Sequence, residues 1–330
     1  MKVLVVGGAG YIGSNMALKL LEAGHSVAVF DDLSTGHLNF VPKKALFIKG
    51  DLKKYKEILS ALRKQKPDAV MHFAASALVG ESVANPLKYY DNNILAMVQL
   101  LKAMRDCQTK RLIFSSTCAV FGQPKQLPIH EEAPKDPTNP YGRSKWMIEQ
   151  MLEDYSKAED FRYIVLRYFN ACGAHPSGEI GERHQPETHL IPNILKVLTG
   201  EKKVLEIFGD DYDTPDGTCV RDYIHIEDLA VAHLLALEAL ASGMKSNGFN
   251  LGTGDGYSVK EIITAVEKVT GKKVKIKVSP RRSGDPARLV AGAEKAKKVL
   301  GWTPKHDLES IIRTAWNWEK SHTLKNHTTN

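Results

Sequence analysis

The 330-residue chain has little cysteine and no long apolar segment. Its four cysteines, Cys107, Cys118, Cys172 and Cys219, form no Cys-x-x-Cys pair, so the pattern offers neither a disulfide framework nor a zinc knuckle. This usage suits a reducing compartment, and we expect a cytoplasmic protein. No apolar run is long enough to cross a membrane, and the run at 3–6 is too short for a signal peptide. We therefore expect no membrane partner.

The chain also lacks the features of a nucleic-acid-binding protein. Its net charge is +7, but the lysines are dispersed or sit in short runs such as 295–298. No basic segment alternates with aromatic residues, as single-strand binding would require. We interpret these lysines as a solvated surface, whose mildly positive field also suits a small anionic substrate.

The amino-terminal residues have the pattern of a strand, a glycine-rich turn, a helix and a second strand. A continuous apolar run at 3–6 is followed by Gly7-Gly8-Ala9-Gly10-Tyr11-Ile12-Gly13, a helical pattern to Leu21 and a strand at 27–30. Glycines let the backbone approach a pyrophosphate, which the following helix N-terminus attracts. Asp31 then stands where a carboxylate binds the ribose 2′-hydroxyl and repels a 2′-phosphate. The unit predicts NAD as cofactor, in preference to NADP.

The alternation of strands and helices continues along the chain. Further strands are predicted at 45–49, 69–73, 111–114, 161–168 and 274–278, and helices at 86–106, 190–198, 226–240, 259–269 and 308–318. We expect an α/β fold, a Rossmann-type doubly wound parallel sheet with a smaller, interwoven carboxyl-terminal α/β substrate domain. The NAD-binding domain is expected at 1–170, joined by about 221–250, and the substrate lobe at 171–330. The polar tail after Trp318 is expected to fray.

A tyrosine and a lysine lie four residues apart at the start of a predicted helix. Asn139 can cap this helix, and Pro140 stands where a first-turn proline is tolerated. Tyr141 and Lys145 then share one face, and a lysine ammonium stabilises a phenolate. Thr117, at a predicted strand end, offers a hydroxyl that could hydrogen-bond a substrate alcohol or carbonyl and orient it towards Tyr141. Taken alone, the pair is equally compatible with an exposed helix without catalytic function, and Thr117 with a backbone cap.

Together these motifs resemble a known family. Gly7-x-x-Gly10-x-x-Gly13, Ser115-Ser116-Thr117 and Tyr141-x-x-x-Lys145 are similar to the extended short-chain dehydrogenase/reductases. Other motifs resemble the UDP-glucose 4-epimerases within them. These motifs lie at 31–37, 72–75, 79–82, 89–93, 167–170, 173–176, 207–212, 221–225 and 281–285. The resemblance extends to about Trp318.

The resemblance implies roles for individual residues. Tyr141 would be the base, Lys145 would lower its pKa and hold the ribose, and Thr117 would bind the reacting oxygen. The residues implied in NAD binding are Gly7, Gly10, Tyr11, Ile12, Gly13, Asp31, Asp32, Leu33, Ser34, Thr35, Gly36, Asp51, Leu52, Phe73, Ala74, Ala75, Asn92, Ser115, Tyr141, Lys145, Tyr168 and Phe169. Those implied in UDP-sugar binding are Thr117, Tyr141, Asn170, His189, Leu190, Glu206, Ile207, Phe208, Arg221, Arg282 and Asp285.

The implied reaction is reversible epimerisation at C4 of a UDP-hexose, UDP-galactose to UDP-glucose. Hydride would pass to tightly bound NAD and return to the opposite face of a 4-keto sugar, so NAD would stay bound throughout. The positive nicotinamide would also help to lower the pKa of Tyr141. Galactose metabolism and a homodimer, paired through the helices at 86–106 and 141–157, are expected by analogy.

Alternative functions remain open at this level. Residues 286–289 lack the aromatic residue of some members, so UDP-N-acetylglucosamine or UDP-xylose are alternative substrates. Ala77 and Gly292 also depart from the usual family pattern. A nucleotide-sugar dehydratase would carry an acidic pair after Thr117, where this chain has Cys118-Ala119. An NAD-sensing module without catalysis would have no need of Thr117, Tyr141 and Lys145 together.

One loop is rich in potential metal ligands. His175, His184 and His189 alternate there with Glu179, Glu182 and Glu187. Their spacing matches no common zinc motif, so we predict a polar loop on the substrate side and no metal.

Overall fold

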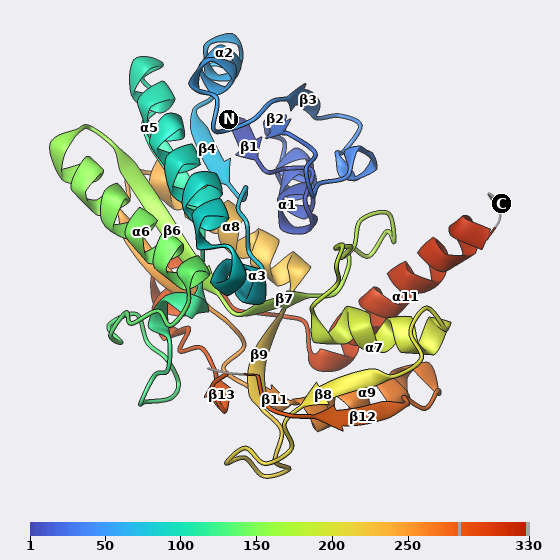
Figure 1. Cartoon of the computed structure of the whole chain (residues 1–330). Helices are drawn as coiled ribbons and strands as arrows, with labels where there is room; N and C mark the ends of the chain where they lie inside the picture. Colours follow the sequence, from blue (N-terminus) through green and yellow to red (C-terminus); the bar gives the residue numbers. More distant parts are fainter. Residues whose placement is uncertain (283–284, 328–330) are drawn as a thin grey trace.

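The computed structural model describes residues 1–282 and 285–327, and within them a seven-stranded parallel sheet forms the centre (Figure 1). The strand order is β10-β6-β5-β4-β1-β2-β3, and every neighbouring pair is parallel. The strands are β1 (Lys2–Val6), β2 (Ser26–Asp31), β3 (Leu46–Lys49), β4 (Ala69–His72), β5 (Arg111–Thr117), β6 (Arg162–Tyr168) and β10 (Asn247–Leu251). Ser283 and Gly284 of the motif at 281–285 lie outside the described residues.

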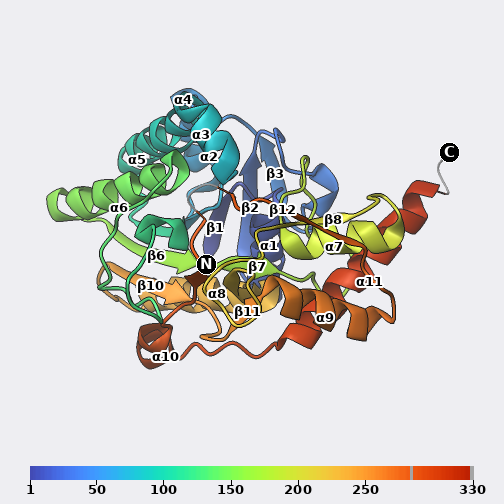
Figure 2. The same cartoon turned by 60° about the horizontal axis from the view of Figure 1, so that its bottom comes forward.

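Helices cover both faces of this sheet (Figure 2). One layer is α2 (Tyr55–Gln65), α5 (Ala96–Asp106) and α6 (Pro140–Ala158), and the other is α1 (Tyr11–Glu22), α8 (Ile226–Ala241) and α10 (Glu294–Leu300). Val3 and Val5 face one layer while Leu4 and Val6 face the other, because successive side chains of a strand point to opposite faces. The doubly wound arrangement predicted from the apolar runs is confirmed.

The carboxyl ends of the central strands lie along one edge of the sheet. Val6 pairs with both Phe30 and His72, and Thr117 pairs with Tyr168. The loops after β1, β2, β4, β5 and β6 therefore start side by side. In parallel sheets this edge is where ligands bind.

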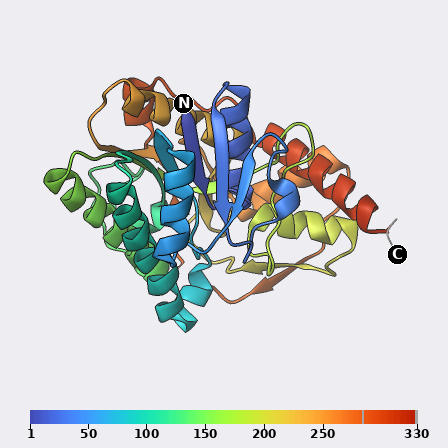
Figure 3. The same cartoon turned by 90° about the horizontal axis from the view of Figure 1, so that it is seen from above.

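The second part of the chain builds smaller sheets below this edge. β7 (Asn170–Cys172), β9 (Val220–His225), β11 (Gly256–Ser258) and β13 (Arg288–Leu289) form one, and β8 (Leu205–Phe208) with β12 (Ile276–Ser279) forms another. They share a core with α7 (Leu190–Thr199), α9 (Val259–Thr270) and α11 (Leu308–His327). Seen from above, α7 and α11 lie on the side of the molecule away from α6 (Figure 3). None of the described helices is long and apolar enough to span a membrane.

Two elements differ from the prediction, whereas the lysine run at 295–298 lies at the surface as predicted. The helix expected at 86–106 is α4 (Pro86–Tyr89), a π-helical segment (Tyr90–Leu95) and α5, because the buried Asn93 side chain bonds residues outside the helix. α11 continues to His327 instead of fraying after Trp318, whose ring packs on Phe40 and whose indole donates to the Glu182 carbonyl. The lysine run at 295–298 lies on α10, which buries Ala296 and Leu300 between its cations.

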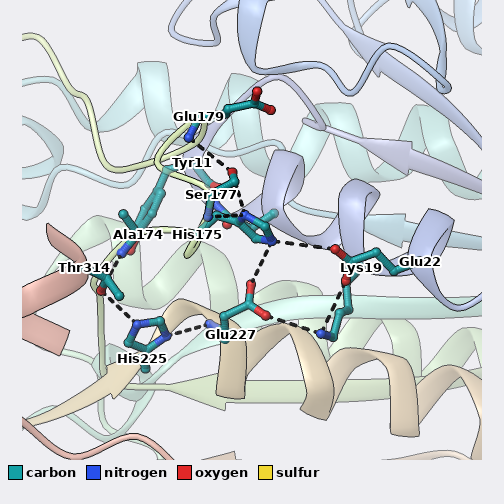
Figure 4. Close-up of polar contacts among 11 residues, drawn as sticks. Tyr11, Lys19, Glu22, Ala174, His175, Ser177, Glu179, His225, Glu227 and Thr314 are labelled. Atoms are coloured by element: carbon teal, nitrogen blue, oxygen red, sulfur yellow. Dashed lines mark hydrogen bonds and ion pairs between the residues drawn. The ribbon is translucent and has the colours of Figure 1, made fainter. Parts of the chain in front are cut away.

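A polar network joins α1 to the segment after β7 (Figure 4). Lys19 pairs with Glu227 of α8 at 3.3 Å, and His175 lies 3.8 Å from the same carboxylate. On the other side, the Thr314 hydroxyl accepts from the Ala174 N–H at 3.2 Å and bonds the His225 ring at 2.9 Å. The segment that begins at Gly173 is thereby held to α1, α8 and α11 at once.

The stability of the fold is expected to fall steeply as the pH drops from about 6.5 to 4. Burial lowers the pKa of His72 and of His225 to about 3, and that of His233 to about 4. The unfolded chain takes up these protons first, so stability present above pH 6.5 is lost on acidification, at up to about 4 kcal/mol per pH unit for three histidines. Urea unfolding of the NAD-saturated protein from pH 7.5 to 4.5 measures this slope.

Replacing His72 by Leu should remove roughly a third of that slope, since both ring nitrogens of His72 are buried without a hydrogen-bond partner among the described residues. The matched control is His130→Leu, which removes a half-exposed imidazole and should leave the slope unchanged. An unchanged slope in His72→Leu would contradict the assignment.

Candidate active site

The turn between β1 and α1 is built to bring the backbone close to a ligand. Gly7 has φ +78°, and a Cβ there would lie 2.4 Å from the Ala74 nitrogen. A Cβ on Gly13 would lie 2.2 Å from the Gly7 carbonyl oxygen, so α1 packs directly against the turn. A Cβ on Gly10 would meet only that same oxygen, at 3.4 Å, and would otherwise point into open space. Gly10 therefore borders free volume at the start of the helix.

The same turn offers a site for an anion beside a carboxylate. The first-turn N–H groups of a helix lack intrahelical partners, and α1 has no acidic residue in its first turn to offset its positive end. Asp31, at the end of β2, accepts hydrogen bonds from the Ala9 N–H at 2.9 Å and the Leu33 N–H at 2.8 Å. Burial raises the pKa of Asp31, so a hydroxyl donor would stabilise its ionised form. These features fit the pyrophosphate and ribose of NAD.

The other residues implied in NAD binding fall on the same edge. Asp51 and Leu52 follow β3, and Phe73 to Ala75 follow β4. Asn92 lies in the π-helical segment and donates to the Ser76 hydroxyl at 2.9 Å, next to that loop. Ser115 and Tyr168 share a hydrogen bond across β5 and β6. The Tyr11 side chain turns away, because its hydroxyl donates to the Gly173 carbonyl at 2.7 Å.

α6 delivers Tyr141 and Lys145 to this edge. The Asn139 side chain accepts from the Gly142 N–H at 2.9 Å, and Pro140 opens the helix, as predicted. A Cβ on Gly142 would lie 2.5 Å from the Ala119 carbonyl oxygen, so the helix start packs tightly on the turn after β5. This close approach brings Tyr141 near Thr117, whose hydroxyl accepts from the Ala119 N–H at 3.1 Å.

The electrostatics of the pair differ from the expectation. Burial raises the pKa of Tyr141, and the nearby Thr117 hydroxyl opposes that rise. Burial also lowers the pKa of Lys145 to about 7, while its amine donates to the Ser115 carbonyl at 2.9 Å. Burial of both groups therefore opposes formation of the Tyr141 phenolate in the polypeptide alone. Further positive charge is needed to favour the phenolate, as expected of the nicotinamide ring.

Two buried groups that the motifs did not single out support α6. The Asn93 side chain donates to the Ser144 hydroxyl at 2.9 Å, between Tyr141 and Lys145, and accepts from the Ser76 N–H at 2.9 Å. Glu149, one turn after Lys145, accepts from the Ser116 hydroxyl at 2.6 Å and pairs with Arg167 of β6. Asn93 stood within a family motif, but its partner could be identified only from the fold.

The residues implied in UDP-sugar binding fall in several places. The Arg282 guanidinium stacks on the Phe208 ring, with its central carbon 4.0 Å from the ring centroid. Arg221 pairs with Asp285, and Asn170 of β7 lies beside Tyr223 of β9. Ile207 is buried, whereas the exposed Glu206 accepts from the Ser279 hydroxyl at 3.2 Å.

His189 and Leu190 stand at the start of α7, where the fold gathers a group that the spacing argument had not predicted. Glu182, His184, Glu187 and His189 bring their ligand atoms within 4.8 Å of one another. The His189 imidazole bonds Glu182 there. His175 and Glu179, the other members of this loop's set, lie instead in the network of Figure 4.

Comparison with known proteins decides the family. Residues 3–252 match the NAD dependent epimerase/dehydratase family. The chain belongs to this family. The match runs from β1 to the end of β10, and the family's description confirms the prediction of NAD as cofactor. The resemblance predicted from the sequence motifs is confirmed as well.

Individual members of the family are similar over nearly the whole chain. A UDP-glucose 4-epimerase from Lactobacillus helveticus is 53% identical over 324 residues, 98% of either chain. A structure of UDP-glucose 4-epimerase from Brucella ovis in complex with NAD is 49% identical with a TM-score of 0.93, covering 96% of this chain and 97% of that one. Another from Bifidobacterium longum, in complex with NAD⁺ and UDP, is 40% identical with a TM-score of 0.93, covering 97% and 98%.

Proposed function

We propose that this protein is a UDP-hexose 4-epimerase that interconverts UDP-galactose and UDP-glucose with NAD held at the β1–α1 turn. The observation that carries the proposal is the meeting of Tyr141, Thr117 and Lys145 on the sheet edge that also presents the glycine turn and Asp31. Two relatives that are about 50% identical to this chain, one of them solved in complex with NAD, are named UDP-glucose 4-epimerase.

In this proposal each residue of the site has one task. When bound, NAD⁺ would supply a reversible hydride acceptor for C4 of the sugar. Tyr141 takes the proton of the 4-hydroxyl in one direction and returns it in the other. Thr117, which lies near Tyr141, orients the reacting oxygen, and Lys145 holds the ribose while its hydrogen bond to the Ser115 carbonyl fixes its place. Positioned proton transfer of this kind contributes about 10²–10⁴ in rate.

The nucleotide part of the substrate is assigned to the residues outside this edge. We place the diphosphate between Arg221 and Arg282, because guanidinium groups bind phosphate oxygens in a bidentate manner, and the uracil beside the Phe208 ring on which Arg282 stacks. Asn170, His189, Leu190, Glu206, Ile207 and Asp285 complete this proposed pocket. With UDP anchored there, the 4-keto sugar can turn over and present its other face.

The proposal includes a division of labour within the chain and a partner. Residues 1–170 with about 221–250 form the NAD-binding part, supported by α8 and β10 joining the large sheet, and 171–330 hold the substrate. We also propose that the protein is cytoplasmic, acts in galactose metabolism and forms a homodimer. Exposed apolar side chains on the expected contact helices support the homodimer, namely Leu87, Leu95 and Met147, of which Leu87 is 73% exposed.

The test is turnover of UDP-galactose by purified protein without added NAD, with UDP-glucose measured by chromatography and NAD measured after denaturation. Product formed together with about one NAD per chain supports the proposal. If the protein contains NAD but converts only UDP-N-acetylglucosamine or UDP-xylose, that sugar nucleotide is the substrate instead of UDP-galactose. Absence of both product and NAD would refute the proposed function.

A further inference from the structure

A cluster of two histidines and two glutamates lies in the segment between β7 and α7. Glu182, His184, Glu187 and His189 each offer one potential ligand atom, and all these atoms lie within 4.8 Å of one another. We propose that this cluster binds one divalent d-block cation of the zinc class, which fixes the segment at the start of α7. The site has no part in the proposed proton or hydride transfer, and His189 would bind the ion through Nδ1, which leaves its Nε2 for the proposed UDP pocket.

Two distances within the cluster match the edge of a tetrahedral site. His184 Nδ1 lies 3.5 Å from Glu182 Oε1 and 3.4 Å from Glu187 Oε2. Zinc bonds of about 2.1 Å place two tetrahedral ligands about 3.4 Å apart. Both pairs are longer than a usual N–H···O hydrogen bond, so these atoms already stand at the edge length of a coordination tetrahedron. The fourth ligand, His189, bonds Glu182 directly, and this pair would separate as the ion enters.

The charges of the cluster also favour a dication. The Glu182 and Glu187 side chains are only 5% and 2% exposed. Two adjacent buried carboxylates repel each other and lose hydration, which is costly without positive charge. Their ion pairs in the described part of the chain run to His184 and His189, and neutral imidazoles would leave both carboxylate charges unbalanced. One dication would offset both carboxylates and let both imidazoles bind in their neutral form.

The surroundings hold the ligands in place. Glu187 Oε1 accepts from the Thr188 and His189 N–H groups at 2.8 and 2.9 Å, which leaves Oε2 directed at His184. The His184 ring packs edge-on against Tyr11 and His189. Such outer contacts orient metal ligands. His189 is half-exposed, so an ion has a path from solvent.

The donor set selects the class of ion. Two nitrogens and two carboxylate oxygens suit zinc, cobalt or nickel, whereas calcium and magnesium prefer oxygen ligands alone. Four protein ligands fill a tetrahedron and leave no open position, which indicates a structural site. The ion would clip the segment near Tyr11 of the glycine turn and near Trp318 of α11, whose indole donates to the Glu182 carbonyl at 3.1 Å.

The test uses the untagged, full-length protein with its NAD, dialysed against a chelator and reloaded with Zn²⁺ or Co²⁺. We expect one ion per chain to survive gel filtration, and the cobalt form to show the intense visible absorption of four-coordinate cobalt. Glu187→Gln and His184→Asn should each weaken Zn²⁺ binding by at least about 10- to 100-fold, since changes even in outer-shell partners have that effect. Zn²⁺ should raise the melting temperature of the wild type and not that of the variants.

The control is His130→Asn, which removes an imidazole paired with Glu294 away from the cluster and should bind Zn²⁺ like the wild type. Sub-stoichiometric retention, a weak octahedral cobalt spectrum, or equal loss in His130→Asn would overturn the proposal. If the cluster variants fail to fold, the stoichiometry and cobalt spectrum of the wild type still decide it.

Discussion

Replacing Tyr141 by Phe is expected to lower kcat for UDP-galactose about 1,000-fold, within the roughly 10²–10⁴ that positioned proton transfer contributes. Only the hydroxyl is lost, and the ring contact of Tyr141 with Tyr89, 6.4 Å between centroids, is available to Phe as well. KM should change little, because the proton is transferred only in the transition state. Bound NAD should remain at about one per chain. Initial rates without added NAD, together with NAD released on denaturation, measure both quantities.

The matched control is Tyr155→Phe, which removes a phenol from the same helix where its ring packs on Phe161. It should keep wild-type turnover. A Tyr141→Phe enzyme with more than about a tenth of the wild-type rate would contradict the role of Tyr141 as base, because the minimum expected loss is about 100-fold. Loss of NAD along with activity would instead assign Tyr141 to holding the cofactor.

Replacing Gly10 by Ala should leave the fold intact and weaken NAD binding about 10- to 100-fold. The reason is that the added methyl group would have to fit into a site that NAD already fills. Gly10 has φ −80° and ψ 173°, which alanine adopts without strain. Its Cβ would meet protein only at the Gly7 carbonyl oxygen, 3.4 Å away, so the methyl occupies the space assigned to the pyrophosphate. Gel filtration followed by NAD quantification, with a melting curve, separates binding from stability.

Two further alanines calibrate this result. At Gly13 a Cβ would lie 2.2 Å from the Gly7 carbonyl oxygen, so Gly13→Ala should lose NAD and also melt at a lower temperature. At the exposed Gly80 of α3 (Val79–Ala84) a Cβ meets nothing within 4 Å, so Gly80→Ala should keep NAD and hold or slightly raise stability. If Gly10→Ala binds one NAD per chain with wild-type affinity, the pyrophosphate does not lie beside Gly10 and the assignment is wrong.

Local sequence patterns predicted the parts of the site that depend on short-range geometry. The glycine turn, Asp31 and the capped start of α6 lie where the pattern placed them, because each is specified within a few residues. The π-helical segment was missed, since the bonds of Asn93 to Ser76 and Ser144 span 17 and 51 residues. The burial that raises the pKa of Tyr141 likewise depends on the whole fold, so the local spacing of Tyr141 and Lys145 does not report it.

The sequence by itself determined the parallel sheet, its glycine turn and the helix that carries Tyr141 and Lys145, because apolar runs, glycines and caps act on neighbouring residues. Only the tertiary structure decided that Thr117 reaches Tyr141 and that Arg282 stacks on Phe208. It alone also gathered Glu182, His184, Glu187 and His189 around one point. Ligand spacing along a loop does not report how the loop folds, and that folding is set by Tyr11 and Trp318, which lie far away in the chain.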